Sequence, residues 1–380
     1  MDDVVIIGGG IIGLTLALEL AEQQVSVTVV DQGPLGQEAS WAGAGMLPPG
    51  NPQYAPTPEA QLRAGSHVLW SALSARLREQ TGIDNGYRET GGLELRFVTD
   101  SETNRLPELE HDLRTWRAEH VEAQPLTSDE LREREPGLGD AVAAGYFLPT
   151  MGQVRNPRHL KALMAACVRR GVTLLPGTPV NRFERVREKV VSAETGQGKI
   201  AAGQFVIASG AWSSRLLAEA GCRADVRPIR GQMLLVSLPG GNPRHVLNVG
   251  PRYVVPRPDG RILIGATQED VGFDKRNTAE GVGGLLQFGS KLFPGLGRAT
   301  YERCWAGFRP GTPDHLPLLG GVPGSENLYV ATGHFRSGLQ MSPFTAKLMS
   351  DLILGRTPSI SLEPFAPDRF NQESRVTAHR

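Results

Sequence analysis

The chain has 380 residues, of which 40 are basic and 40 acidic, so its formal net charge is zero. A balanced charge gives no long-range field to attract nucleic acid or an anionic membrane surface, and neither is an expected partner. The three cysteines are widely spaced and the eight histidines are scattered, which argues against a disulfide framework and against a metal site. The cysteine pattern makes a reduced cytoplasm the expected location. No 18 uninterrupted apolar residues occur, so no membrane span is predicted.

The first forty residues predict a βαβ unit. Residues 4–7 are all apolar, as expected for a strand of a parallel sheet that is covered on both faces. A glycine-rich turn follows, then a helix with apolar residues from Ile12 to Leu20. A second strand over residues 25–30 ends on Asp31.

Further αβ pieces follow along the chain, separated by strand-rich blocks. The αβ pieces are a helix over 157–170 with a strand over 172–175, buried strands over 205–208 and 328–331, and a helix from about 342 to 354. The blocks at about 88–150 and 227–308 contain alternating strands, among them 92–97, 232–237 and 261–265. Such insertions predict a second domain built on a larger antiparallel sheet. The last ~15 residues are polar and are expected to be frayed.

Gly8, Gly10 and Gly13 form a G-x-G-x-x-G motif between the first strand and the first helix. Gly8 permits the tight turn, Gly10 lets the backbone approach a pyrophosphate, and Gly13 lets helix and strand pack closely. The helix N-terminus adds unpaired N–H groups and partial positive charge. Asp31 lies where it can accept hydrogen bonds from a ribose diol. The motif predicts dinucleotide binding but does not separate NAD from FAD.

Residues 40–47, Ser-Trp-Ala-Gly-Ala-Gly-Met-Leu, are rich in small side chains. A segment of this kind can lie against a flat ring system with its backbone N–H groups exposed. A flexible linker is the alternative, but the large apolar side chains of Trp41, Met46 and Leu47 argue against it. This segment therefore favours a flavin over a nicotinamide cofactor.

Four later motifs complete a pattern that covers essentially the whole chain. They are VIASGAWSS (206–214), RYVVPRPDGRILIGAT (252–267), WAGFRPGTPDHLP (305–317) and ATGHFRSGL (331–339). With the two N-terminal motifs, they resemble the glycine oxidase/ThiO members of the D-amino-acid oxidase-like flavoprotein superfamily. The last three motifs are specific to the glycine oxidase branch.

The resemblance implies an enzyme with noncovalent FAD that oxidatively deaminates glycine and small amines such as sarcosine and D-alanine. Hydride transfer to the flavin would give an imine and then an oxoacid, ammonia and hydrogen peroxide. Molecular oxygen is the expected acceptor, with a quinone left open. The resemblance also implies a link to assembly of the thiamine thiazole. The oligomeric state stays open, a homo-oligomer included.

The expected fold is α/β, with a Rossmann-type FAD-binding domain and an inserted antiparallel-sheet (α+β) substrate domain. The resemblance implies that the FAD-binding domain is discontinuous. We expect it to comprise residues 1–87, 152–226 and 310–366, with the substrate domain formed by 88–151 and 227–309 and a C-terminal tail over 367–380.

The resemblance also assigns residues to the cofactor. Ile11 and Ile12 would lie under the pyrophosphate, and Asp31 with Gln32 near the adenosine ribose. Val180 would contact adenine through its backbone. The remaining expected cofactor contacts are Ala39, Ser40, Ala44, Gly45 and Met46 at the flavin, Gly210 after the strand over 205–208, and His334, Phe335, Arg336, Ser337, Gly338, Leu339 and Gln340 around the pyrimidine end.

Arg309 is the candidate for a bidentate clamp on the substrate carboxylate. A surface salt bridge is the alternative, but the flanking Trp305, Phe308 and Pro310 make a fully solvated arginine less expected. Tyr253 is the candidate for a second hydrogen bond to the same carboxylate, although a tyrosine at the start of an apolar strand is more often ordinary packing. Arg336 is expected at the flavin edge or the substrate entrance.

Two further residues bear on the family assignment. Some related sarcosine oxidases attach FAD through a cysteine in this region, but Cys304 is expected to be a small packing residue instead. Gln268 stands where some family members carry an apolar methionine, which leaves the preference for N-substituents open. The alternatives are a D-amino acid or sarcosine oxidase or dehydrogenase, a non-catalytic flavin module, and a nicotinamide-dependent dehydrogenase.

Overall fold

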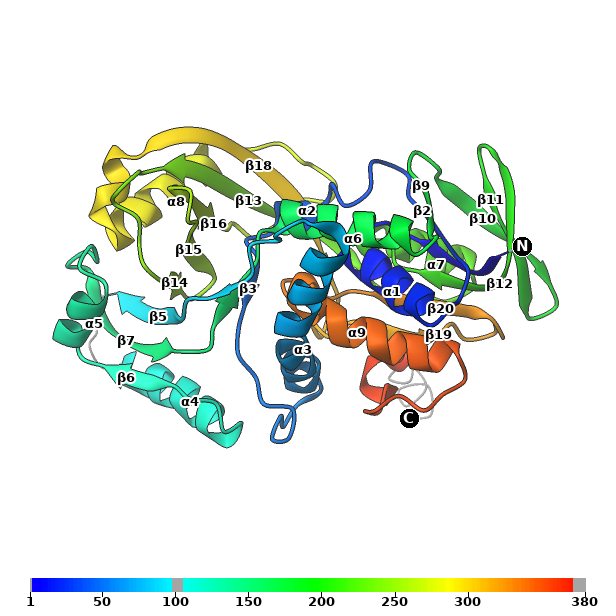
Figure 1. Ribbon diagram of the computed structural model, residues 1–380, viewed down its shortest axis with the longest axis horizontal. Coiled ribbons are helices and arrows are strands. Elements are labelled where there is room, and N and C mark those ends of the chain that lie inside the picture. The colour runs from blue at the N-terminus through cyan, green and yellow to red at the C-terminus, as the bar shows by residue number, and fades with distance from the viewer. Residues whose placement is uncertain (1, 98–104, 372–380) are drawn as a thin grey trace, which may run out of the picture.

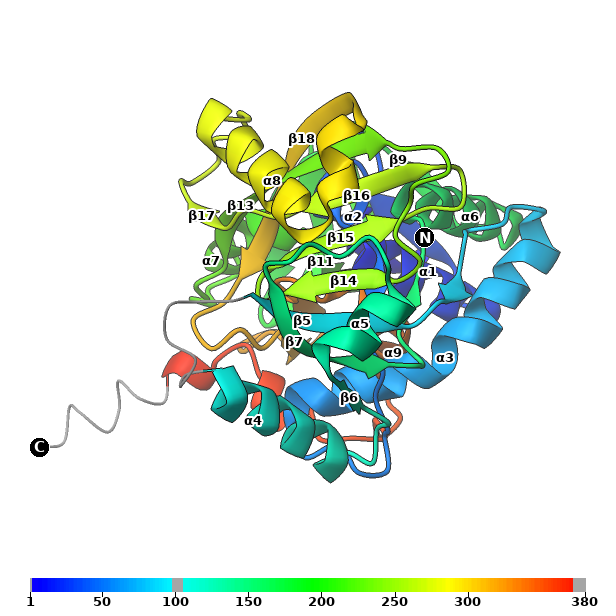
Figure 2. The ribbon, with the colours of Figure 1, turned by 90° about the vertical axis from the view of Figure 1, so that its left-hand side faces the viewer.

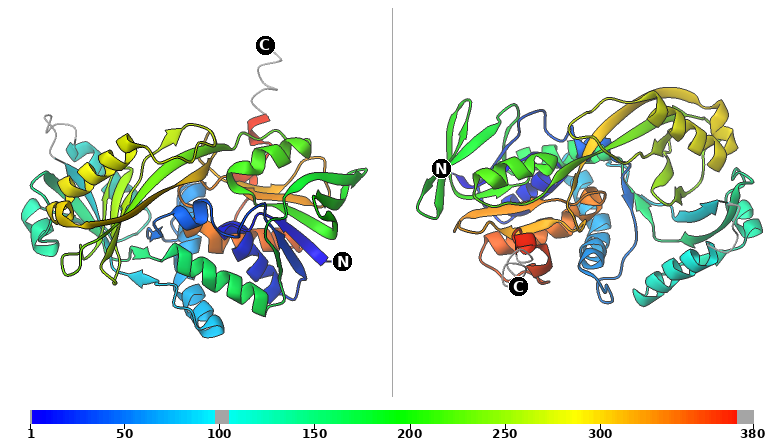
Figure 3. Two further views of the ribbon diagram at one scale, coloured as in Figure 1. Left: turned by 90° about the horizontal axis from the view of Figure 1, so that it is seen from above. Right: turned by 180° about the vertical axis from the view of Figure 1, so that it is seen from behind.

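The computed structural model describes residues 2–97 and 105–371. These residues form two large sheets that lie side by side along the long axis of the molecule (Figure 1; Figure 3). A small three-stranded sheet lies where the two halves meet. The first sheet is built mainly from parallel strands and the second mainly from antiparallel ones.

The first sheet has eight strands. They are β1 (Asp2–Ile7), β2 (Val27–Val30), β9 (Thr173–Leu175), β10 (Val180–Val186), β11 (Lys189–Thr195), β12 (Gly198–Ile207), β19 (Leu318–Gly321) and β20 (Leu328–Thr332). Their order is β10-β11-β12-β1-β2-β9, with β20 beside β12 and β19 beside β20. The pairs β12–β1, β1–β2, β2–β9 and β12–β20 are parallel, as the apolar run in the first strand predicts.

Helices cover both faces of the first sheet. One face carries α1 (Ile11–Glu22), α6 (Asn156–Arg169) and α9 (Gly338–Ile353), and α3 (Pro58–Thr81) packs on α9. The other face carries α7 (Ser213–Glu219). In β1, Val4 and Ile6 pack with the first group and Val5 and Ile7 with the second. A strand buried on both faces has no polar alternation, which explains its sequence.

The second sheet has nine strands. They are β5 (Gly92–Phe97), β6 (Gln124–Leu126), β7 (Val142–Leu148), β13 (Arg227–Ser237), β14 (Val246–Val249), β15 (Arg252–Pro256), β16 (Arg261–Gly265), β17 (Glu269–Asp270) and β18 (Thr300–Gly311). Their order is β17-β13-β16-β15-β14-β5-β7-β6, with β18 beside β13. All pairs are antiparallel apart from β5–β14, which is parallel.

Three helices accompany the second sheet. They are α4 (Arg105–Ala118), α5 (Ser128–Arg134) and α8 (Ala279–Leu292). Figure 2 shows α8 at one end of the sheet and α4 and α5 at the other. Leu285, Phe288 and Leu292 of α8 are buried in the core beneath the sheet. This half therefore has an apolar core of its own.

The small sheet holds the short segment that follows α2 (Ala39–Ala42). It consists of β3 (Met46–Leu47), β4 (Arg88–Glu89) and β8 (Gly152–Gln153). The buried Arg257 guanidinium donates to the Ala44 carbonyl and to Gln153 Oε1, both at 2.6 Å. Val154 N–H donates to the Gly45 carbonyl at 2.7 Å. Backbone and side-chain bonds thus fix the Ala44–Met46 segment in place.

Several predicted boundaries differ from the observed ones. Strands β12 and β13 begin at Gly198 and Arg227, before the expected starts at 205 and 232. Helix α9 begins at Gly338, four residues before the expected start. Pro343 inside it cannot donate to the Leu339 carbonyl, but Ser342 Oγ donates to that carbonyl at 2.8 Å. At the C-terminus, residues 366–371 are held in place, because Arg369 bonds the Asp314 carboxylate at 2.8 Å. Residues 372–380 of the expected tail lie outside the described part of the chain.

Candidate active site

A cavity of about 420 Å³ lies at the carboxyl ends of the parallel strands, where the two sheets meet. Gly8 follows β1, Asp31 follows β2, Ala208 follows β12 and His334 lies two residues beyond β20, and all four residues line the cavity. The opposite side is formed by β18 and by neighbouring strands of the second sheet. Ligands of open α/β sheets bind in this position, and the volume is typical of a ligand site.

The glycine motif forms the turn between β1 and α1. Gly8 has a φ of +121°, and a Cβ on it would lie 2.3 Å from the Ala208 carbonyl oxygen. A Cβ on Gly13 would lie 1.9 Å from the Gly8 carbonyl oxygen, so Gly13 packs behind the cavity and does not line it. The nearest atom to a Cβ on Gly10 is Ser40 Oγ at 3.2 Å. The Gly10 backbone is therefore open to a ligand.

The N-cap of α1 is Gly10, which has no side chain to cap the first turn, and this turn faces the cavity. Ile11 N–H donates to Ser40 Oγ at 2.8 Å. The Asp31 carboxylate accepts from the N–H groups of Gly9 at 2.8 Å and Gly33 at 2.9 Å, and burial raises the pKa of Asp31. Asp31 therefore stabilises the turn after β1. The contact of Asp31 with a ribose stays a prediction from the sequence.

A second helix N-terminus, that of α9, also lines the cavity. Its first residue follows Ser337, whose side chain makes no capping hydrogen bond. His334 is buried, which lowers its pKa to about 3 and keeps the ring neutral. Its Nε2 pairs with Thr345 Oγ1 at 3.1 Å, and its Nδ1 has no hydrogen-bond partner among residues 2–97 and 105–371. Gln340 anchors the helix by donating to the Pro48 carbonyl at 2.8 Å.

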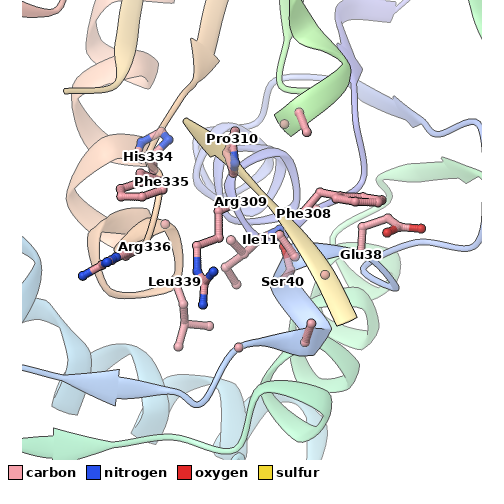
Figure 4. A pocket seen from close by; sticks show the side chains of 18 of the residues that line it. Ile11, Glu38, Ser40, Phe308, Arg309, Pro310, His334, Phe335, Arg336 and Leu339 are labelled. Carbon is pink, nitrogen blue, oxygen red and sulfur yellow. The ribbon is translucent and has the colours of Figure 1, made fainter. Parts of the chain in front are cut away.

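Arg309 extends from β18 towards the middle of the cavity (Figure 4). Its Nη1 donates to the Thr267 carbonyl at 3.0 Å. The guanidinium lies over Gly231 of β13, where a Cβ would stand 2.2 Å from Nη1. Within the described residues Arg309 forms no ion pair with a carboxylate. The surface salt bridge that the sequence left open for Arg309 is therefore absent within the described residues. The positive charge of Arg309 can pair with an anionic ligand.

Strand β18 is held against helix α2. Trp305 Nε1 donates to the Ala42 carbonyl at 3.0 Å, and a Cβ on Gly307 would lie 2.6 Å from the Ala42 Cβ. Trp305 also packs edge-on against Trp41, with ring centroids 5.3 Å apart. These contacts set the position of Arg309 relative to the first half of the molecule.

Tyr253 and Arg336 line the same cavity as Arg309. The Tyr253 hydroxyl donates to Met233 Sδ at 3.2 Å, and burial raises its pKa while Arg309 acts in the opposite direction. Arg336 donates to Gln268 Oε1 and lies over the Phe335 ring at 5.3 Å. In Figure 4 its guanidinium points away from that of Arg309. Burial lowers the pKa of Arg336, and the nearby Arg309 adds to this effect.

The other residues predicted from the sequence also come together here. Apart from Gly13, every one of them lines the cavity: Gly8, Gly10, Ile11, Ile12, Asp31, Gln32, Ala39, Ser40, Ala44, Gly45, Met46, Val180, Gly210 and His334 to Gln340. The Val180 carbonyl accepts from Arg215 Nη2 at 2.7 Å. Cys304 does not line the cavity and packs partly buried beside the core of the second sheet.

Sequence reasoning missed several cavity residues. Asn156, at the start of α6, donates to the Ser40 carbonyl at 2.7 Å, and its Oδ1 is buried without a described partner. Trp212 lines the cavity and stacks on Phe273 at 5.1 Å. Glu94 and Asn248 reach the cavity from β5 and β14. Trp212 lies in the VIASGAWSS motif, although that motif gave no sign that its side chain lines the cavity. Asn156, Glu94 and Asn248 lie in none of the motifs, so only the tertiary arrangement identifies them.

Comparison with known proteins assigns the family. A family model described as FAD dependent oxidoreductase (DAO) matches residues 3–352. The chain belongs to this family. Its members use FAD, so the choice of FAD over a nicotinamide is confirmed, as are the α/β fold class and the assignment as an oxidoreductase.

Relatives of this FAD-dependent oxidoreductase confirm the resemblance to glycine oxidases. Glycine oxidase of Pseudomonas putida is 37% identical, with 96% of this chain and 98% of the relative covered. The bifunctional protein ThiO/ThiG of Synechocystis is 38% identical over 97% of this chain, which spans 54% of that longer protein. The crystal structure of glycine oxidase from Geobacillus kaustophilus superposes with a TM-score of 0.92 at 36% identity, covering 97% of this chain and 98% of the other.

The residues of the cavity fit FAD. Two helix N-termini whose own N-cap residues make no side-chain capping bond face one cavity, and such termini stabilise a pyrophosphate and a negatively charged ring. The open backbone at Gly10 and the unpaired buried atoms of His334 and Asn156 offer contacts that the described residues do not use. Among the described helices, none has the length and apolar character that crossing a membrane requires.

Proposed function

We propose that this protein is a glycine oxidase that oxidises glycine and small amines such as sarcosine and D-alanine. The observation that carries the proposal is the Arg309 guanidinium, which projects into the cofactor cavity and is bonded there to the neutral Thr267 carbonyl. Likeness to glycine oxidases over nearly the whole chain supports the same substrate class.

Arg309 and Tyr253 orient the substrate in this proposal. The planar guanidinium can bind both oxygens of a carboxylate, and the Tyr253 hydroxyl can turn from Met233 to donate to the same group. Holding the carboxylate fixes the direction of the α C–H bond, which is where orientation contributes most to the rate. Bound FAD supplies the acceptor for the hydride that leaves this carbon.

The products would be an imine and then an oxoacid, with ammonia, and hydrogen peroxide if molecular oxygen is the acceptor. Oxygen, the cytoplasmic location, the division of the chain into an FAD-binding and a substrate domain, and noncovalent attachment of FAD are parts of the same proposal. The likeness to the ThiO/ThiG protein supports a role in forming the thiamine thiazole.

Steady-state kinetics with a set of amines tests this function. Glycine, sarcosine and D-alanine should all be oxidised, with kcat/KM values above that for D-phenylalanine. Faster turnover of D-phenylalanine than of glycine would assign the protein to the D-amino acid oxidases of the same scaffold. A clearly higher kcat/KM for sarcosine than for glycine would favour the sarcosine oxidase alternative.

A further inference from the structure

One row of residues crosses the second sheet and forms part of the cavity wall. Met233, Gly265, Tyr253, Asn248 and Glu94 lie opposite one another on β13, β16, β15, β14 and β5. Residues directly opposite on paired strands project from the same face of a sheet. Met233, Tyr253, Asn248 and Glu94 accordingly all line the cavity. The wall therefore changes from apolar at Met233 to acidic at Glu94.

Glu94 is a carboxyl group with few partners. Asn248 Nδ2 donates to its Oε1 at 2.6 Å, and its Oε2 accepts no hydrogen bond from the part of the chain that the structure describes. Arg96, two residues along β5, pairs with Asp112 and Glu108 instead. Burial raises the pKa of Glu94. Glu94 is half-buried and forms no ion pair within the described residues, so a ligand that brings a donor can bind its remaining oxygen.

The distance from Tyr253 to Glu94 along the row is longer than a glycine molecule. Neighbouring strands lie about 4.8 Å apart, so Glu94 is two strand spacings, roughly 10 Å, from Tyr253 along the row. A glycine whose carboxylate is held by Arg309 and Tyr253 is too short to cover that span. The acidic end of the row is therefore available to a longer substrate.

We infer that Glu94 is a specificity-determining residue that binds an ammonium or hydroxyl group at the far end of an amine substrate longer than glycine. This inference rests on the proposed amine oxidation at the same site. It assigns to this chain a substrate class of small amino acids or N-substituted glycines that end in a hydrogen-bond donor. A second carboxylate at this end would meet the Glu94 carboxyl group and be disfavoured.

Two pairs of nearly isosteric amines test the inference. N-(2-Aminoethyl)glycine is compared with N-propylglycine, and D-2,4-diaminobutyrate with D-norvaline, each as kcat/KM divided by the value for glycine. The parent protein should favour the ammonium member of at least one pair by about tenfold or more. Glu94→Gln keeps an acceptor for Asn248 but loses the charge, and should reduce that ratio by roughly 10- to 150-fold, the range for a charge-assisted hydrogen bond.

Glu110→Gln is the matched control, because the Glu110 side chain on α4 is 68% exposed and lies outside the cavity. It should leave the ratio unchanged. A parent that prefers the alkyl member of both pairs, or a Glu94→Gln variant that keeps the ammonium preference, would overturn the inference. Failure of the proposed function looks different, because glycine itself would then not be oxidised. In that case ligand binding is read from the flavin absorption, with the same ratios expected in Kd.

Discussion

The charge on Arg309 determines how much binding free energy a small substrate can obtain in this site. Glycine offers little surface, so its carboxylate supplies most of the available binding energy. Arg309→Ala should therefore raise the KM for glycine by roughly 10- to 150-fold, since a charge-assisted hydrogen bond is worth about 1.5–3 kcal/mol. kcat should fall as well, because a loosely held glycine rarely points its α C–H bond at the flavin. Steady-state kinetics on variants with parental flavin spectra gives both constants.

Conservative variants separate geometry from charge at the same position. Arg309→Lys should recover little, because an ammonium cannot reproduce the planar pair of donors. Tyr253→Phe should cost less than Arg309→Ala, about one neutral hydrogen bond. If Arg309→Ala has near-parental KM and kcat, Arg309 does not bind the carboxylate, and Arg336 becomes the next candidate.

At the residue scale, the sequence predicts those site residues that occur in motifs. Arg309 stands between large apolar neighbours in a family-specific segment, and the glycines of the first turn have distinct steric roles. Glu94 and Asn248 have no such signal. They reach the cavity because β5 pairs in parallel with β14, and a pairing between strands about 150 residues apart leaves no local trace in a single sequence.

Among the elements, the β1–α1 turn should control cofactor retention. Gly10→Val would place a branched side chain on the open backbone between α1 and Ser40 Oγ, which already lies 3.2 Å from the position of a Cβ. We expect the variant to fold but to retain little FAD, as measured by the ratio of flavin to protein absorbance after gel filtration. Gly283→Val is the control, since a Cβ there meets nothing within 4 Å. Normal FAD content in Gly10→Val would remove the turn from the cofactor site.

The contact between α3 and α6 predicts a pH-dependent stability. His159 of α6 is buried against Trp70 of α3, and burial lowers its pKa from 6.5 to about 3. Between these values the unfolded chain binds one more proton than the folded chain, so the stability falls as the pH falls. From pH 7 to 5 this one histidine should cost about 2 kcal/mol of unfolding free energy.

His159→Gln isolates this contribution, because His334 and the carboxyl groups remain in both proteins. Denaturant unfolding at pH 7 and pH 5 should show a loss of stability that is about 2 kcal/mol smaller in the variant than in the parent. The same loss in both proteins would mean that His159 is protonated in the folded state or reaches water there.

Elements are predicted well where local patterning and burial agree. The apolar run of β1, the helix after the glycine turn and the amphipathic α6 follow from periodicity. The start of α9 does not, because Pro343 suggests a later beginning and the side chain of Ser342 compensates for the lost backbone bond. A side-chain hydrogen bond to a helix carbonyl depends on the folded geometry, which residue propensities do not describe.

For the whole molecule, the order of the segments along the chain predicts two sheets, each with its own helices. It does not predict the contacts between them. The first half offers two helix N-termini for a cofactor, and the second half brings Arg309 to it on a strand that packs on α2 through Trp305 and Gly307. The register between β13 and β18 sets Arg309 beside Gly231. Pairings over such distances are decided by packing of the complete chain.

In the proposed reaction, glycine held in this cavity reduces bound FAD. The direct measurement is the visible absorption of the purified yellow protein when glycine is added under strictly anaerobic conditions, with acid precipitation of the same sample to show that FAD is released into the supernatant. We expect glycine to bleach the flavin absorption in the parent and to do so far more slowly in Arg309→Ala. An unchanged spectrum in the FAD-loaded parent at excess glycine would contradict the proposed reaction.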